Sequence, residues 1–594
     1  MQIVGGDAQD ILPTEFSVEN KVYEYGGPLF DITNDGQVIF SNMDNTLRVL
    51  NTETQQVSLL PTQPGFRYSS FNANAKSAWV LAVEEDHTSF AASEITHSVV
   101  AINVATAAVQ KVATGADFYH APCFSLDGTR MAWLEWDNPG LPFNAAKLYD
   151  AEWDDNGTIT NIRLITAAQA SVTEPRWGHD GSLFFAQEVA GYRQLFHLPL
   201  GSNKPVLINL AGLEEAEFGQ VDLLDGSRTY VPVSMNRIFA IIAIKGVHMP
   251  IVINLDSLSW REVAQSQNIV QVMLDAVSRL TDSSVLVVAQ SVSSGQALYK
   301  IDLDTPYRNT IIRKTLDEEE FKADYSVPET LCIESRQRPS RKIYGFLWMP
   351  HNKNLFASTG ELPPLIIDAH GGPTWMAGSG LDLKIQYFTS RGYAYAVINY
   401  TGSTGYGKDY RESLFGSWGI LDASDAAECA EYLASTGRVN SKAIGISGHS
   451  AGGYCVLQCL TLFPHLFAAG VCAAGVSDVK ALSDTTHKLE LHYADLLLGC
   501  YGLCDEDKLR IYHQRSAIRL ANRIKSPLLM LHGELDTVVP IGQMREMARK
   551  LAESGAEMKL VEVEGEGHML DSPSAVRIWL MEEEAWWRKT LLMA

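Results

Sequence analysis

The first half of the chain consists of short alternating or β-branched apolar runs separated by turn residues. Between residues 20 and about 320, six similar segments each place a polar or glycine turn before a strand rich in aromatic and β-branched residues. They begin at residues 33, 72, 125, 179, 234 and 281, as in SLDGTRMAWLEWD at 125 and GHDGSLFFAQE at 179. Each segment predicts a β-hairpin, and their spacing of about 39 to 56 residues is close to that of four-stranded propeller blades.

This region has enough strand for about twenty or more strands, whereas a sandwich needs about seven strands in ~100 residues. The pattern therefore favours an all-β propeller of six to seven blades over residues 1–325. Two successive sandwich or barrel domains are the alternative.

After residue 325 the pattern changes to apolar strands that alternate with amphipathic helices. Strands are expected to begin near residues 364, 393, 442, 468, 526 and 559, and helices near 424, 451, 542 and 573. Near-continuous apolar strands with helices between them indicate a mostly parallel sheet that is covered on both faces. We therefore predict a second domain, of α/β class, over residues 326–594.

Composition and charge narrow the classes of partner. The chain has 594 residues, 46% hydrophobic and 20% charged, with a net charge of −23. Nucleic acids and anionic membranes require clustered Lys and Arg, so neither is an expected partner. The N-terminus lacks the pattern of a secretory signal, and no apolar run approaches the ~18 residues that span a bilayer. We expect a cytoplasmic protein, and the sequence leaves a homo-oligomer open.

A serine between two glycines marks the end of one predicted strand. The segment GISGHSAGGY at residues 445–454 places Gly448-x-Ser450-x-Gly452 where KAIGISG ends and a helix begins. Ligands approach the carboxyl ends of the strands in a doubly covered sheet. A serine exposed there occupies a strained turn, and glycine leaves room for the backbones packed on either side. The pattern predicts Ser450 as a nucleophile.

The acid and the base that would activate this serine follow it in the chain, each after a predicted strand. A serine hydroxyl needs a base, which is itself held by a carboxylate. In this architecture the chain order is Ser, then Asp or Glu, then His, each after a strand. LLMLHGELDTVVP presents Asp536 after one strand, and KLVEVEGEGHML presents His568 after the next. Five other carboxylates compete for the acid role without matching both position and order: Glu534, Glu562, Glu564, Glu566 and Asp571.

An oxyanion site is the remaining requirement. LIIDAHGGPTW ends another strand in His370-Gly371-Gly372-Pro373, where backbone amides are exposed. We expect exposed amides of this loop to join the amide of Ala451 in holding the negative charge that develops when a carbonyl is attacked.

Together these motifs resemble the prolyl oligopeptidase family of serine peptidases, in its acylaminoacyl-peptidase and dipeptidyl-aminopeptidase-like branch. The resemblance rests on HGGP, GHSAGG, HGELDTVVP and GEGH, and it extends into VYEYGGPLF and YTGSTGYGKDYR. It implies an α/β-hydrolase domain behind a β-propeller. Ser450 would be the nucleophile, Asp536 the orienting acid and His568 the base, and the oxyanion amides would be those of Gly372 and Ala451. Relatives generally have several tens of residues before the segment like VYEYGG. The resemblance thus implies a propeller that closes differently or a truncated start.

The residues that hold the substrate depart from the family pattern. Dipeptidyl peptidases hold a free amino terminus with paired glutamates, and no such pair is evident in this sequence. Thr537 and Val538 fill the loop that carries a carbonyl-binding side chain in relatives. Candidate substrate-binding residues are His370, Glu135 in WLEWD and Glu490 in THKLELHY. Carboxylates of this kind are more often solvated or structurally paired.

Three functions fit these observations. The favoured one is a serine hydrolase that cleaves short peptides or small amides, with a propeller that excludes folded proteins and water. A biosynthetic amide-processing or acyl-transfer enzyme would use the same acyl-serine, and a non-catalytic propeller binding protein would need no triad at all. The expected chemistry requires no metal or organic cofactor. Cys500 and Cys504 lack the second Cys/His pair of a metal site.

Overall fold

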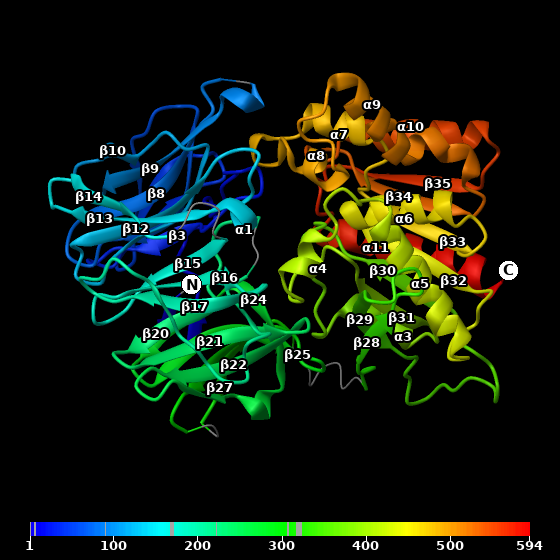
Figure 1. Ribbon diagram of the computed structural model, residues 1–594, viewed down its shortest axis with the longest axis horizontal. Coiled ribbons are helices and arrows are strands. Elements are labelled where there is room, and N and C mark those ends of the chain that lie inside the picture. Colours follow the sequence, from blue (N-terminus) through cyan, green and yellow to red (C-terminus); the bar gives the residue numbers. More distant parts are fainter. Residues whose placement is uncertain are drawn as a thin grey trace.

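The computed structural model describes residues 2–4, 7–89, 91–166, 171–220, 223–305, 308–316 and 324–593. Figure 1 shows two bodies side by side, with sheets of the N-terminal part on the left and a helix-covered sheet on the right. The last N-terminal strand ends at Lys314 and the first strand of the large sheet begins at Glu329. The expected boundary at residues 325/326 lies in this interval and stays a prediction.

The N-terminal body is a six-bladed β-propeller. Each blade is an antiparallel sheet of four strands, or of five in the fifth blade. The first three blades contain β3 (Phe30–Ile32), β4 (Gln37–Ser41), β5 (Leu47–Asn51), β6 (Val57–Leu60), β7 (Phe66–Ala73), β8 (Trp79–Asp86), β9 (Thr96–Asn103), β10 (Ala108–Ala113), β11 (Phe118–Phe124), β12 (Arg130–Trp136), β13 (Lys147–Trp153) and β14 (Ile159–Leu164). The last three contain β15 (Val172–Trp177), β16 (Leu183–Val189), β17 (Tyr192–Leu198), β18 (Val206–Leu207), β19 (Glu217–Phe218), β20 (Tyr230–Ser234), β21 (Arg237–Ile244), β22 (Val247–Asn254), β23 (Ser259–Glu262), β24 (Ile269–Thr281), β25 (Ser284–Ser291), β26 (Ala297–Asp302) and β27 (Thr310–Lys314). Before the blades, β1 (Gln2–Val4) and β2 (Asp7–Gln9) form a hairpin.

The six segments expected from the sequence are the interior strands β4, β8, β12, β16, β21 and β25 of the six blades. Interior strands are buried on both faces, which explains why they carry the aromatic and β-branched residues that made the repeat visible. At the turn before β12, Gly128 has a φ of 73°, a conformation that favours glycine. The propeller prediction is confirmed, and the alternative of two sandwiches is wrong.

The C-terminal body is an α/β-hydrolase domain around one eight-stranded sheet. The strand order is β28-β29-β31-β30-β32-β33-β34-β35, antiparallel at the β28–β29 and β29–β31 pairs and parallel elsewhere. Its strands are β28 (Glu329–Glu334), β29 (Lys342–Trp348), β30 (Leu365–Ala369), β31 (Ala394–Asn399), β32 (Ile444–His449), β33 (Ala469–Ala473), β34 (Leu528–Gly533) and β35 (Met558–Val563). The doubly covered, mostly parallel sheet is confirmed.

Helices cover both faces of this sheet. On one face, α5 (Leu421–Ser435), α6 (Ala451–Leu462) and α10 (Gly542–Glu553) share one apolar core with the buried side chains of Leu365 and Ile367. On the other face, α3 (Leu383–Thr389) and α11 (Pro573–Trp587) pack on Ile366 and Leu529. Neighbours along a strand alternate between the two cores, so both faces must be apolar.

Three helices between β33 and β34 have no counterpart in the sequence prediction: α7 (Val479–Thr485), α8 (Tyr493–Leu498) and α9 (Asp505–Arg515). Two of them have seven residues or fewer, and α9 buries only Tyr512 among its residues. Short helices and helices with a narrow apolar face give a weak periodic signal. This segment also holds a 3₁₀ turn at Lys488–Glu490 that reaches the propeller.

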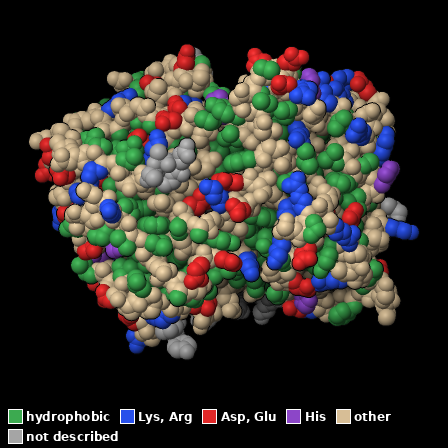
Figure 2. Space-filling view, viewed as in Figure 1, with side chains coloured by type: hydrophobic (Ala, Val, Ile, Leu, Met, Phe, Trp, Pro, Cys, Tyr) green, Lys and Arg blue, Asp and Glu red, His purple; other side chains and the backbone are tan. Residues whose placement is uncertain are grey.

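Charged contacts join the two domains beside the short helices α1 (Pro142–Ala145) and α4 (Lys408–Glu412). The buried Arg411 of α4 lies 2.5 Å from Glu188 of the propeller, and Lys408 lies 3.3 Å from the same carboxylate. Elsewhere, acidic and basic side chains are interspersed on the face shown in Figure 2. Within the described ranges, no helix is both long enough and apolar enough to cross a bilayer.

Candidate active site

Ser450 lies at the junction between β32 and α6. Its φ of 58° and ψ of −120° are unusual for a residue with a side chain, and such strain is often found at functional sites. The flanking glycines make the turn sterically feasible. A Cβ on Gly448 would lie 2.4 Å from the backbone of Gly452, and a Cβ on Gly452 would lie 1.9 Å from the backbone oxygen of Ala369.

The structure brings the three residues of the predicted triad together. The Nε2 atom of His568 lies 3.0 Å from the Oγ atom of Ser450, and its Nδ1 atom lies 2.8 Å from Oδ2 of Asp536. A carboxylate only accepts hydrogen bonds, so Nδ1 carries the hydrogen in the neutral ring and Nε2 is free to accept from the hydroxyl. This tautomer is the one that a general base for serine requires.

Asp536 is a buried carboxylate with several donors. Its Oδ1 atom accepts hydrogen bonds from the amides of Val538 and Val539, and Oδ2 lies 3.1 Å from Nε2 of His532. Burial alone would raise the pKa of Asp536. Hydrogen bonds from His532 and His568 outweigh burial and hold this pKa well below its ordinary value. The carboxylate is therefore ionised at neutral pH and fixes the orientation of His568.

The two predicted oxyanion residues border the same pocket as Ser450. Gly372 follows β30 with a φ of 119°, and Ala451 is the first residue of α6. Neither amide donates a hydrogen bond to another described residue. A Cβ on Gly371 would lie 3.5 Å from the Cβ of Ser450, so the glycine loop packs against the nucleophile. Both amides are available to an incoming oxygen.

The pocket beside Ser450 has a largely apolar lining and one carboxylate. Its side walls come mainly from α7, α8 and the loop after Asp536, with Val476, Leu482, Ala494, Leu497, Val538 and Val539. The carboxylate belongs to Glu490, whose Oε1 accepts a hydrogen bond of 3.0 Å from the hydroxyl of Tyr25. Tyr25 comes from the propeller, so both domains build this pocket. Burial, followed by the charge of Glu490, raises the pKa of Tyr25 well above its ordinary value.

Of the three candidate substrate-binding residues, the structure brings only Glu490 to this pocket. Glu135 lies on β12, where it accepts a hydrogen bond of 2.9 Å from the indole of Trp133. The ring nitrogens of His370 lie 2.7 Å from the backbone oxygen of Gly371 and 2.7 Å from Oγ of Ser403. Burial lowers the pKa of His370 to about 4. Glu135 and His370 contact protein partners and do not line the pocket.

Sequence reasoning missed three side chains of the site, namely Tyr25, Tyr493 and His532. His532 lies at the end of β34, just before Gly533. The motif HGELDTVVP does mark the end of this strand, but only Asp536 was assigned from it. Tyr25 and Tyr493 lie in the pocket lining. Tyr25 stands 425 positions before Ser450, so no local pattern connects the two.

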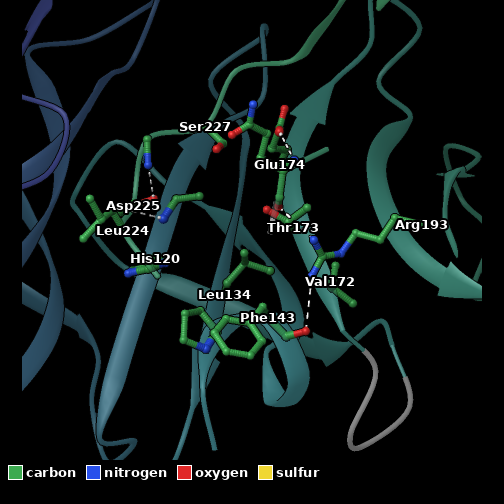
Figure 3. Close-up of a pocket in the computed structure, with 14 residues that line it drawn as sticks. His120, Leu134, Phe143, Val172, Thr173, Glu174, Arg193, Leu224, Asp225 and Ser227 are labelled. Carbon is green, nitrogen blue, oxygen red and sulfur yellow. Dashed lines mark hydrogen bonds between the residues drawn. The ribbon is translucent and has the colours of Figure 1, made fainter. Parts of the chain in front are cut away.

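A second cavity lies within the propeller, between β11, β15 and the loop around Asp225 (Figure 3). Its carboxylates already have protein donors. Oδ2 of Asp225 accepts from the amide of Ala121 at 3.0 Å, and Glu174 accepts from the amide of Thr229 at 2.7 Å. The buried Glu174 and the partly buried Asp225, with these partners, stabilise the packing of neighbouring blades.

Metal ligation finds no support in the described residues. No group of three or more His, Cys, Asp or Glu side chains in these ranges is placed to hold a metal ion. Cys500 is buried against Asp495, and Cys504 is exposed.

Comparison with known proteins finds that this chain is similar to several peptidases. A profile of the prolyl oligopeptidase family matches residues 379–593. The acylamino-acid-releasing enzyme of Arabidopsis thaliana is 30% identical over 245 residues, which are 39% of this chain and 30% of that enzyme. The dipeptidyl aminopeptidase BIII of Pseudoxanthomonas mexicana is 27% identical over 41% of this chain and 35% of its own length. The match thus spans about a third of each curated relative.

Among solved structures the similarity extends over both domains. A puromycin-hydrolysing peptidase of Mycobacterium tuberculosis superposes with a TM-score of 0.90 and is 27% identical, covering 99% of this chain and 90% of its own. A puromycin hydrolase superposes with a TM-score of 0.89 at 25% identity, over 98% of this chain and 88% of its own.

Proposed function

We propose that the chain is a serine peptidase of the prolyl oligopeptidase type, which cleaves short peptides or small amides through an acyl-enzyme on Ser450. The observation that carries this proposal is the chain of two hydrogen bonds, 3.0 Å and 2.8 Å, from Ser450 through His568 to Asp536. The amides of Gly372 and Ala451, which have no hydrogen-bond partner among the described residues, border the same pocket.

The geometry supports a reaction in two stages. Nε2 of His568 takes the proton of Ser450 as Oγ attacks the substrate carbonyl, and the amides of Gly372 and Ala451 hold the resulting oxyanion. His568 then gives this proton to the leaving amine, which breaks the amide bond. In the second stage His568 takes a proton from water, whose oxygen attacks the acyl-serine, and the proton returns to Ser450 as the acid leaves.

The pocket indicates which end of a substrate it holds. Apolar side chains such as Val476 and Leu497 suit one apolar side chain of the acyl part. Glu490 is the carboxylate in this lining, and Nε2 of His487 lies 3.6 Å from its Oε2. We assign Glu490 as the partner of a free α-amino group, which makes an unblocked aminoacyl residue the preferred acyl part.

The position of the propeller supports selection by size. Tyr25 of the propeller forms one wall of the pocket, so a folded protein bound at Ser450 would collide with the propeller. Short, flexible peptides avoid this collision. Closing the pocket also removes water, which strengthens the electrostatic contacts with the oxyanion.

A fluorophosphonate probe tests the nucleophile directly. We expect the wild-type protein to carry one adduct on Ser450, located by mass spectrometry, and the Ser450→Ala variant to carry none. An adduct on a different serine, or no adduct in folded wild-type protein, would refute the proposal.

A panel of substrates tests the assignment of Glu490. It contains aminoacyl, dipeptidyl and N-acyl anilides together with puromycin, the compound after which the structural relatives are named. We expect the aminoacyl anilides to react fastest, and Glu490→Gln to slow them about 10-fold or more while N-acyl substrates change little. Preference for N-acyl anilides would refute the role of Glu490. Added amines that divert the acyl group would instead identify an acyl-transfer enzyme.

A further inference from the structure

His449, the residue just before the nucleophile, makes a contact that the proposed mechanism does not use. Its Nε2 atom lies 2.7 Å from the backbone oxygen of His568, and the centres of the two rings are 5.0 Å apart. A carbonyl oxygen only accepts, so Nε2 of His449 carries the hydrogen. Burial, followed by the neighbouring His568, lowers the pKa of His449 to about 4. The ring is therefore a neutral donor of fixed tautomer at neutral pH.

The loop that receives this hydrogen bond has little backbone support of its own. Within the described structure, the backbone of residues 567–571 makes a single hydrogen bond, the one from His449 to His568. The preceding turn is held by the amide of Leu535, which donates to the oxygen of Glu566 at 2.8 Å. After that point, Leu570 packs into the core, but no other hydrogen bond fixes the peptide plane next to the base.

His449 is itself held in place on its other sides. Its ring centre lies 5.8 Å from the ring of Trp579 in α11. The Nζ atom of Lys384 lies 4.9 Å from the Trp579 ring and 2.9 Å from a carboxylate oxygen of Glu583. A Cβ on Gly371 would lie 4.0 Å from Nδ1 of His449, so the ring also packs below the oxyanion loop. His449 therefore offers a rigid donor to a weakly supported acceptor.

We propose that His449 is a positioning residue: it fixes the backbone of His568 and so keeps the imidazole within reach of Ser450. The inference rests on the proposed serine-peptidase function. Because His449 directly precedes Ser450 in the chain, its hydrogen bond to His568 ties the position of the base to that of the nucleophile. A misplacement of about 1 Å in such an arrangement can cost about 100-fold in rate.

Two substitutions separate positioning from packing. His449→Leu keeps bulk but removes the donor, whereas the side-chain amide of His449→Gln can donate from nearly the same point. We expect kcat on an aminoacyl anilide to fall 10- to 100-fold in the leucine variant, with KM within about 2-fold. Glutamine should restore most of kcat. His120→Leu, which removes another buried histidine inside the propeller, is the matched control and should keep its kcat.

A measurement that does not depend on turnover accompanies the kinetics. Hydrogen exchange of a peptide covering residues 564–572 should become faster in His449→Leu and return toward the wild-type rate in His449→Gln. Equal exchange in all three proteins, or an unchanged kcat in the folded leucine variant, would overturn the role of His449. If wild-type protein shows neither turnover nor labelling, the proposed function fails, and the exchange rates alone decide whether His449 holds the loop.

Discussion

At the residue scale, the proposed chemistry depends on a carboxylate that stays ionised inside the protein. Asp536 has a side chain that is fully shielded from solvent, yet the ring of His568 and two backbone amides donate to it, and Nε2 of His532 lies 3.1 Å from its Oδ2. These donors lower its pKa in the folded protein, whereas an unfolded chain leaves it near about 3.9. The folded state therefore binds fewer protons than the unfolded state between these two values.

This difference predicts how stability depends on pH. A depressed carboxylate pKa contributes stability that is present above the unfolded value and is lost as pH falls toward the folded value. We expect acidification from pH 6 to pH 3 to lower the Tm of the wild-type protein more than that of Asp536→Asn. The contribution lost should be about 1–3 kcal/mol.

Calorimetry or dye-based melting over this pH range measures both proteins side by side. The other carboxylates titrate equally in wild type and Asp536→Asn, so their effects cancel in the Tm difference between the two proteins. A Tm difference that stays constant from pH 6 to pH 3 would contradict the depressed pKa.

Activity of Asp536→Asn at neutral pH should fall about 10⁴-fold, because the asparagine side chain favours the wrong tautomer of His568.

At the element scale, the junction of β32 and α6 depends on glycine for clearance. Gly452 is helical and has no unusual φ, so backbone freedom is not the reason for glycine at this position. The oxygen of Ala369 on the neighbouring strand β30 occupies the space that a Cβ would need.

We expect Gly452→Ala to displace the strand–helix junction. It should cost about 1–3 kcal/mol in the free energy of unfolding, together with most of the fluorophosphonate labelling of Ser450. Gly542→Ala in α10 is the control, because a Cβ at that position meets nothing within 4 Å. Urea unfolding and labelling of both variants provide the comparison. Normal labelling of a fully stable Gly452→Ala would contradict the clearance argument.

Strands and long helices of both domains were predictable because their periodicity is local. The strand KAIGISG and the helix after Ser450 became β32 and α6, and SLDGTRMAWLEWD became β12. The segment with α7, α8 and α9 was not predicted, since its short helices acquire their stability from packing against the rest of the domain. Glu490 lies in that segment. Its place in the pocket was therefore beyond what the pattern of apolar residues could show.

At the scale of the whole molecule, the pocket exists only where the two domains meet. Two residues before Tyr25, the hydroxyl of Tyr23 donates to the backbone oxygen of Tyr119 in the propeller at 2.7 Å. The hydroxyl of Tyr25 donates a hydrogen bond to Oε1 of Glu490 in the hydrolase domain. Nζ of Lys488 makes another contact across the interface, 3.1 Å from Oδ1 of Asp117.

Tyr25→Phe tests whether this contact contributes to substrate choice. The variant keeps the ring and removes the hydrogen bond that orients Glu490. We expect kcat/KM on aminoacyl anilides to fall about 10-fold, equivalent to one hydrogen bond to a charged group, while N-acyl anilides keep their rate. Tyr432→Phe on α5, whose side chain is half exposed and remote from the pocket lining, serves as the control. Equal losses on both substrate classes would show that Tyr25 acts on closure of the domains and not on Glu490.

The sequence by itself determined the two fold classes, because burial imposes a period of two on strands and 3.6 on helices wherever a chain must cover its core. It also predicted Ser450, Asp536 and His568, since in this architecture the ends of successive strands carry the reacting groups in a known order. Tertiary structure decided the rest. Contacts between Tyr25 and Glu490, or between His449 and the backbone of His568, join residues more than 100 positions apart. Their strength depends on distances that only the packed domains define.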